Sequence, residues 1–215
     1  MAPTIHLVRH AEAMHNVSLD HVVLPDARLT ARGRAQADAL ATTFPFMAQV
    51  THLVSSPLDR AIETCVRGLG PAMGRGGRVP RIVLHPDLQE TGAYACNVPS
   101  KLGWLVLRWG RHVDAALLAP GWDERGPGSV RDEGDPAKVR AREVRARRWL
   151  RDLARAAADD AHIVVVSHQN FIGALAGDRG RQSALRNAAF RSYQFQGDDH
   201  PVFGPTLVET FESRT

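Results

Sequence analysis

The stretch from His162 to Ser167 constrains the fold more than any other part of the chain. Its sequence, His-Ile-Val-Val-Val-Ser, is a nearly continuous apolar run of β-branched residues. Such a run is typical of a strand that is covered on both faces, and strands of that kind occur mainly in parallel sheets with helices on either side. The run therefore predicts an α/β protein.

Strands and helices alternate along the rest of the chain. The apolar residues from Ile5 to Val8 predict a first strand, and Thr30 is a suitable N-cap for a helix that reaches Phe44. Ser56, followed by Pro57, marks the start of a second helix. The other expected elements are strands at 50–56, 81–84, 190–195 and 206–211 and helices at 139–157 and 170–176. This order predicts a three-layer sandwich, with a largely parallel central sheet and helices on both faces.

Residues 92–136 interrupt this alternation. They carry Trp104, Trp109 and Trp122 among glycines and prolines, and only the part from 102 to 118 has a partly helical pattern. Long irregular segments in compact domains often cover a functional site, although a segment that only packs on the sheet edge fits this pattern as well. We expect one domain over residues 1–215 with a lid-like insertion at 92–136.

The positive charge of the chain comes almost entirely from arginine. The formal net charge is +4, and lysine occurs only at positions 101 and 138. The densest arginine block, 140–155, is interleaved with Glu143 and Asp152 on an amphipathic helix pattern. A solvated helix face explains such a block, so we expect no nucleic acid partner.

Cysteine content and hydropathy indicate a cytoplasmic protein. Cys65 and Cys96 do not have a Cys-x-x-Cys or Cys/His spacing, so we expect reduced thiols and no metal site. The first predicted strand follows Met1 almost directly, which leaves no room for a signal peptide, and no run approaches the length of a membrane span. We expect neither a cofactor nor a membrane partner, and the sequence does not indicate an oligomeric state.

Three predicted strands end in side chains suited to binding an anion. Arg9 and His10 end the first, Arg60 lies in the first helical turn after the second, and His168 ends the run at 162–167. In an open α/β sheet, ligands bind outside the carboxyl ends of the strands. Two guanidinium groups and two imidazoles at this edge predict a site for a phosphoryl group.

Four blocks of the chain form a recognisable set. They are Arg-His-Ala-Glu at 9–12 with Asn16, Ser-Pro-Leu-Asp-Arg-Ala-Ile-Glu-Thr at 56–64, Leu-Gln-Glu at 88–90 and Val-Ser-His at 166–168. These blocks resemble the histidine phosphatase superfamily, which contains the phosphoglycerate mutases. Within that superfamily the chain is most similar to fungal phosphoglycerate-mutase-like proteins. The segment from Tyr94 to Asp135 has no recognisable motif.

The resemblance implies roles for individual residues. His10 would be the nucleophile, and Glu90 would protonate the leaving alcohol. The residues implied to bind the phosphoryl oxygens are Arg9, Arg60 and His168, with Asn16 and Gln169 as further hydrogen-bonding groups. Asn16 could instead cap a loop, Gln169 could point away from the pocket, and Glu90 could be a surface carboxylate. Glu12 is expected to be structural, because a carboxylate in a phosphate pocket would repel the substrate.

These residues predict a metal-independent phosphatase that acts on a small phosphomonoester through a phosphohistidine. Three alternatives remain open at this point: a phosphoglycerate-mutase-type phosphotransferase, a pocket adapted to a non-phosphate acidic metabolite, and a binding or scaffold protein without turnover. Gln169-Asn170 after the second histidine, and Thr91-Gly92-Ala93-Tyr94 after the acid, depart from the mutase pattern. A glycolytic mutase is therefore the less favoured assignment.

Overall fold

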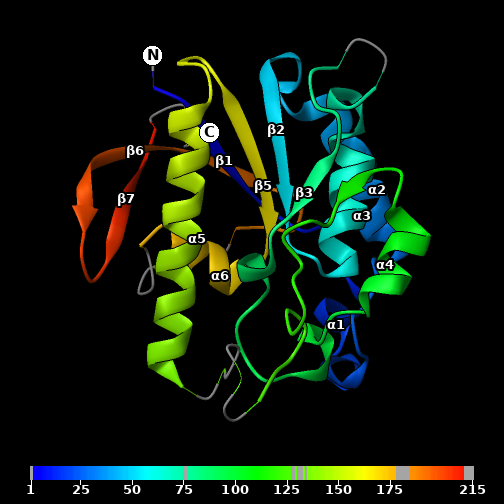
Figure 1. Ribbon diagram of the computed structural model, residues 1–215. Coiled ribbons are helices and arrows are strands. Elements are labelled where there is room, and N and C mark those ends of the chain that lie inside the picture. The colour runs from blue at the N-terminus through cyan, green and yellow to red at the C-terminus, as the bar shows by residue number, and fades with distance from the viewer. Residues whose placement is uncertain are drawn as a thin grey trace.

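A twisted sheet forms the middle layer of the computed structural model, which describes residues 2–74, 77–126, 129, 133, 135–177 and 185–210 (Figure 1). Within these residues the strand order is β4-β3-β2-β5-β1-β6-β7. The strands are β1 (Thr4–Arg9), β2 (Val50–Ser55), β3 (Ile82–Leu84), β4 (Val113–Asp114), β5 (His162–Ser167), β6 (Phe190–His200) and β7 (Gly204–Glu209). The first five are parallel to one another, and β6 and β7 add an antiparallel edge beside β1. The predicted α/β class and the largely parallel sheet are confirmed.

Strand β5 lies at the centre of this sheet, between β1 and β2. Its apolar residues alternate between two cores, as successive side chains of a strand must. Val164 and Val166 pack in one core, while Ile163 and Val165 pack in the other, and all four are fully buried. The prediction of a strand covered on both faces is thus confirmed.

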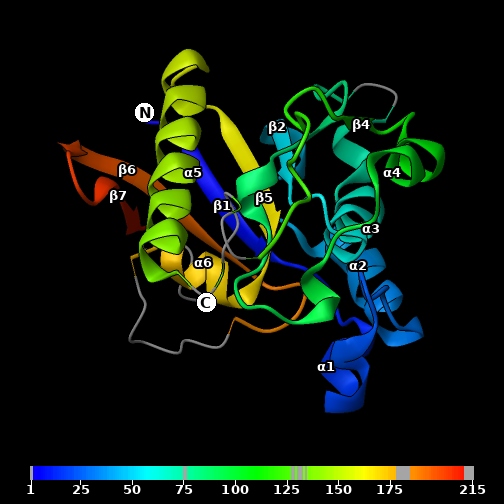
Figure 2. The ribbon, with the colours of Figure 1, turned by 60° about the horizontal axis from the view of Figure 1, so that its bottom comes forward.

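Helices cover both faces of the sheet, as Figures 1 and 2 show. Side chains of α2, α3 and α4 belong to the core on one face, and side chains of α5 and α6 belong to the core on the other. The helices are α1 (Met14–Val17), α2 (Ala31–Thr43), α3 (Asp59–Gly68), α4 (Leu102–Trp109), α5 (Pro136–Ala156) and α6 (Gln169–Leu175). Short 3-10 turns are η1 (Leu19–Val23), η2 (Met47–Gln49), η3 (Gly70–Ala72), η4 (Pro86–Leu88) and η5 (Ala95–Asn97). None of the helices in the described part of the chain has both the length and the apolarity to cross a membrane.

The two predicted N-caps have different outcomes. Thr30 caps α2, because its hydroxyl accepts the Gly33 N–H at 2.9 Å. Helix α3 starts later than expected: its N-cap is Leu58 rather than Ser56, and Pro57 precedes the helix. The N–H of Ser56 donates to Val166 O at 2.9 Å, so Ser56 prolongs the pairing of β2 with β5, and the helix begins only after Leu58.

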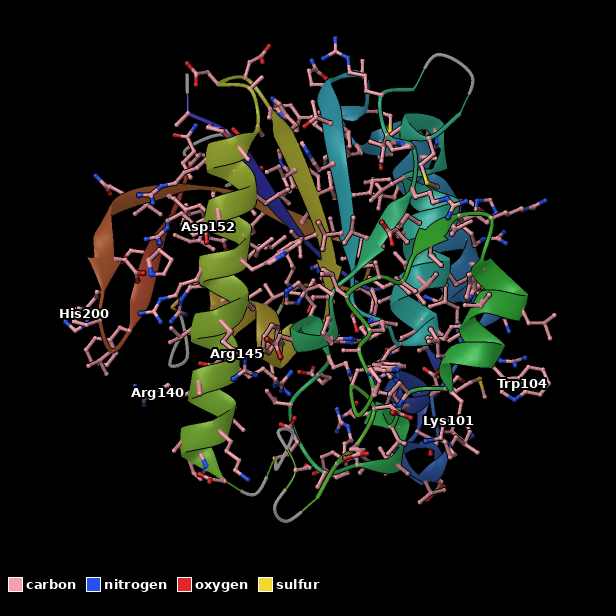
Figure 3. The ribbon with its side chains drawn as sticks, in the orientation of Figure 1. Lys101, Trp104, Arg140, Arg145, Asp152 and His200 are labelled. Atoms are coloured by element: carbon pink, nitrogen blue, oxygen red, sulfur yellow. The ribbon has the colours of Figure 1, made fainter. Side chains whose placement is uncertain are left out.

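The long helix α5 is less solvated than its arginine content suggested. Arg140, Arg145 and Asp152, labelled in Figure 3, are exposed, in agreement with the predicted polar face. Arg142 and Glu143 are instead buried, at 1% and 2% exposure. Arg147 is buried as well, and it donates to Ala174 O at 2.8 Å. The expectation of a solvated block was wrong for these three residues, because other parts of the folded chain cover this face of the helix.

The segment at 92–136 contributes to the sheet and to the core. Its strand β4 pairs with β3 at the sheet edge, and Leu105, Leu118 and Trp122 join the core on the α2 and α3 side. The predicted strand at 206–211 begins at Gly204 and ends at Glu209, and its last residue, Phe211, lies outside the described residues.

Candidate active site

The register of the parallel strands brings three strand ends to one edge of the sheet. Arg9 pairs with Ser167 between β1 and β5, and Ser55 pairs with Val166 between β2 and β5. One residue further along, the His10 N–H donates to Ser167 O at 2.9 Å. The residues that directly follow β1, β2 and β5 therefore lie side by side at this edge, and they are His10, Ser56 and His168.

His10 is buried, with 2% of its surface exposed. Its Nδ1 lies 2.7 Å from the carbonyl oxygen of Ala11. A carbonyl can only accept, so Nδ1 carries the proton and Nε2 keeps its lone pair. Burial, together with the charges of Arg60 and Arg9 and the neighbouring His15, lowers the pKa of His10 well below its usual range. The ring is therefore neutral at physiological pH and can act as a nucleophile.

His168 is fully buried against His10, with 5.0 Å between the ring centroids. Its Nε2 lies 2.8 Å from the hydroxyl oxygen of Ser56. The same hydroxyl accepts the Leu58 N–H at 3.3 Å, so its own proton is available for His168 Nε2. This assignment leaves the imidazole proton on Nδ1, a buried atom without a hydrogen-bond partner in the described part of the structure.

Two guanidinium groups flank the histidines. Arg60, in the first turn of α3, is fully buried and donates to Cys96 O at 2.6 Å and to Asn97 Oδ1 at 2.9 Å. Arg9 donates to Leu185 O at 2.8 Å. The Nε atoms of both arginines are buried and have no partner among the described residues. Each arginine is thus held at one end and retains a free donor.

Glu90 follows η4 on the loop after β3. Its Oε1 accepts the N–H groups of Thr91 and Phe171, at 2.8 and 3.1 Å, and its Oε2 accepts the Asn170 N–H at 3.2 Å. Burial raises the pKa of Glu90, and these N–H donors and the charge of Arg60 oppose the rise. The carboxyl group is fixed to the first turn of α6, directly after His168.

The loop that carries Glu90 is held by two arginines that the sequence patterns did not indicate. Arg142 of α5 donates to Gln89 O at 2.6 Å and to Asp87 O at 3.1 Å, and it forms an ion pair with Glu133 at 3.0 Å. Arg125, from the segment at 92–136, donates to Glu90 O at 3.4 Å. No local signal marks either residue, because their partners on the acid loop are carbonyl groups far away in the sequence.

Asn16 and Gln169 lie at the margin of the site. The Asn16 carbonyl oxygen accepts the Ala13 N–H at 3.0 Å, and its amide nitrogen lies 3.2 Å from His15 Nε2. These contacts fit the alternative prediction, in which Asn16 caps a loop. Gln169 is the first residue of α6, and its side chain makes no hydrogen bond with the described residues.

Glu12 joins the loop after β1 to helix α2. Its carboxylate accepts the Thr30 hydroxyl at 2.7 Å and pairs with Arg32 at 3.4 Å. Gly33 packs on the same loop so closely that an added Cβ would lie 1.9 Å from Glu12 O. These contacts fit the structural role expected of Glu12.

Within the described residues, no group of three or more His, Cys, Asp or Glu side chains is arranged to hold a metal ion. A neutral imidazole beside buried guanidinium groups, at the carboxyl edge of a parallel sheet, is instead the arrangement of an anion-binding α/β protein.

Comparison with known proteins narrows this class. Residues 5–98 match the sequence model of the histidine phosphatase superfamily, branch 1. Over these residues the chain is similar to the histidine phosphatase superfamily. A search of curated proteins gives no match.

Solved structures share the fold over almost the whole chain. Ecdysone phosphate phosphatase from Bombyx mori is 14% identical with a TM-score of 0.64, over 97% of this chain and 92% of that chain. Mycobacterial glucosyl-3-phosphoglycerate phosphatase is 21% identical with a TM-score of 0.56, over 96% of each chain. A phosphoserine phosphatase mutant from Entamoeba histolytica is 18% identical with a TM-score of 0.55, over 99% of this chain and 98% of that chain.

Proposed function

We propose that this protein is a metal-independent phosphatase that hydrolyses a small phosphomonoester through a phosphohistidine at His10. The main support is the state of His10, whose Nδ1 is tied to Ala11 O while its Nε2 keeps a lone pair. Phosphoryl transfer depends on positioning and on neutralising charge. The guanidinium groups of Arg60, which is buried, and of Arg9, which is half-buried, can supply that charge, so chelating agents should leave turnover intact.

In the first step, His10 Nε2 attacks phosphorus and a P–N bond forms. The bond from phosphorus to the leaving oxygen breaks, and its electron pair stays on that oxygen, which takes a proton from Glu90. Arg9 and Arg60 and the Nδ1–H of His168 hold the three non-bridging oxygens. The pKa of Glu90 is raised by burial, which supports its role as the acid.

In the second step, the Glu90 carboxylate takes a proton from a water molecule as the water oxygen attacks phosphorus. The P–N bond breaks, its electron pair returns to His10 Nε2, and inorganic phosphate leaves. Asn16 and Gln169 have supporting roles at the rim of this pocket. The proposed substrate class is a small phosphorylated metabolite. The similar structures are of phosphatases named for different substrates, so the proposal specifies only the class of substrate.

The fold family also contains mutases, which return the phosphoryl group to a second acceptor. A mutase would yield a phosphorylated product, whereas hydrolysis yields free phosphate. Because Cys65 and Cys96 are both free thiols, we further propose that the protein works in the reducing cytoplasm.

Acid-quench trapping with a labelled phosphomonoester tests the proposal. Wild-type protein should give an acid-labile, base-stable phosphoprotein and release free phosphate, and His10→Ala should give neither. His112→Ala serves as a matched control, because His112 contacts Arg111 and lies far from the site in the sequence. Label that persists in His10→Ala would overturn the assignment of the nucleophile.

A further inference from the structure

His15 is a third imidazole at the candidate site, and the proposed mechanism does not use it. It lies in the short helix α1, and its ring centroid is 5.5 Å from that of His10. Burial and the charges of Arg60 and Arg9 lower the pKa of His15 to about 3. Its ring is therefore neutral at physiological pH.

The two ring nitrogens of His15 have different surroundings. Nε2 lies 3.2 Å from the Asn16 amide nitrogen. Nδ1 is buried and has no hydrogen-bond partner in the described part of the chain. A buried polar atom without a partner is rare in folded proteins, and at an active site it often marks the place of a ligand.

The contacts of Asn16 fix the proton on His15. The Ala13 N–H donates to one side-chain atom of Asn16 at 3.0 Å, so that atom must be the carbonyl oxygen. The amide NH₂ therefore faces His15 Nε2 and donates to it. A neutral imidazole that accepts at Nε2 carries its proton at Nδ1. The unpartnered atom of His15 is thus a hydrogen-bond donor.

We propose that His15 Nδ1–H donates to a non-bridging oxygen of the phosphoryl group bound at His10, and that Asn16 is a positioning residue that sets the tautomer of His15. The inference rests on the proposed function. In this arrangement His15 touches the substrate, and Asn16 acts only through His15.

A neutral donor suits this position. Two guanidinium groups already lie beside His10, and a third cation there would add repulsion between positive groups in a buried site. His15 adds a hydrogen bond to the phosphoryl oxygens without adding charge. The bound phosphoryl group in turn satisfies a donor that is otherwise without a partner.

Calorimetric titration with inorganic phosphate measures this hydrogen bond directly. His15→Phe keeps a ring of similar shape but removes the donor, and its dissociation constant for phosphate should rise about 10-fold or more, as is typical for losing a hydrogen bond to a charged group. His112→Phe, at a histidine outside the site, should bind like the wild type. Equal thermal midpoints would show that the folds are intact.

A double-mutant cycle separates the role of Asn16 from that of His15. Asn16→Ser should weaken phosphate binding in the wild-type background and have little effect in the His15→Phe background, because Asn16 acts through His15. In ¹⁵N spectra, His15 Nδ1 should be protonated in the wild type and lose part of that population in Asn16→Ser.

The outcomes distinguish this inference from the proposed function. If His15→Phe binds phosphate as tightly as the wild type, the role of His15 is wrong. If the two substitutions have additive effects, Asn16 does not act through His15. In both cases a phosphohistidine at His10 can still be trapped. If wild-type protein neither binds phosphate nor forms a phosphoprotein, both proposals are overturned.

Discussion

The hydroxyl oxygen of Ser56 lies 2.8 Å from Nε2 of His168, across two adjacent strands of the sheet. Both residues follow directly after a strand, and both are fully buried. Their hydrogen bond fixes the orientation of the His168 ring and leaves its buried Nδ1 without a partner among the described residues. Ser56, which the sequence suggested as a helix cap, is therefore a positioning residue.

Replacing Ser56 with alanine should lower kcat/KM about 10-fold, because the His168 ring loses the contact that orients it. The matched control is Ser55→Ala. Ser55 is equally buried, but its hydroxyl donates to Ser56 O at 2.9 Å and not to a histidine ring. Steady-state kinetics on both variants, with unfolding midpoints, would show whether the loss is specific to Ser56. Equal loss of activity in both variants would contradict the assigned role.

Replacing Arg60 with lysine should reduce kcat/KM by about 10²-fold or more. The two terminal nitrogens of Arg60 donate to Cys96 O and Asn97 Oδ1 and fix the planar guanidinium, whereas the ammonium of lysine is a point charge and cannot reproduce this forked contact. Arg67→Lys, on the same helix and paired with Asp38 at the surface, should retain full activity. Wild-type rates in Arg60→Lys would argue against the proposed anion pocket.

Replacing Glu90 with glutamine should slow phosphorylation by about 10²–10⁴-fold on an alkyl phosphomonoester and much less on an aryl one. An alkoxide needs a proton as it leaves, whereas a good phenolate leaving group does not. Single-turnover quench measurements on both substrates give the two ratios. If both substrates lose the same factor, Glu90 is not the proton donor.

Replacing Arg142 with methionine should destabilise the protein by about 3–5 kcal/mol, because the buried carboxylate of Glu133 and two loop carbonyls lose their partner. Arg148→Met, on the same helix, removes a partly exposed pair with Asp199 and should cost only about 0–1 kcal/mol. Urea unfolding measures both values. Similar costs for the two variants would show that Arg142 does not anchor the acid loop.

Stability should fall in acid, partly because of His6. His6 is buried between Ser192 and His162, and burial, with the charge of His162, lowers its pKa to about 3. The folded state keeps His6 neutral, whereas the unfolded chain binds a proton below about pH 6.5. The contribution of His6 is therefore complete above pH 6.5 and is lost as the pH falls towards 3.

The slope from this one group is about 1.4 kcal/mol per pH unit below its ordinary pKa. The free energy of unfolding of His6→Gln should therefore decline less steeply than that of the wild type. Urea titrations at pH 7.5, 6 and 5 would test this difference. Parallel pH profiles for the two proteins would rule out His6 as a contributor.

Much of the fold and part of the site could be predicted because the signals are local. The run at 162–167 predicts a buried strand by itself, and Thr30 marks the start of α2 through a bond to Gly33, three residues away. His10 and His168 end predicted strands, and parallel strands place their carboxyl ends together. Features that follow from chain periodicity and short-range capping were accessible from the sequence.

Other features depend on contacts between distant residues. Helix α3 starts after Leu58 because Ser56 continues the pairing with β5, which no helix signal reveals. Arg142 looked like part of a solvated face, and its partners lie on loops that only the folded chain brings to α5. His15 carries no signal beyond its position before Asn16, since its importance rests on an unpartnered atom.

The contact between Gly33 and Glu12 O has a consequence for how the substrate range of this protein can change. Helix α2 meets the loop after β1 through a residue with no side chain, and even one methyl group would collide with the loop backbone. A larger residue at position 33 would therefore displace the loop that carries the nucleophile proposed here. Residues 92–126 instead reach the acid loop through side chains such as Arg125. Diversification of specificity, by natural drift or in a designed library, therefore has room on the insertion side and almost none beside α2.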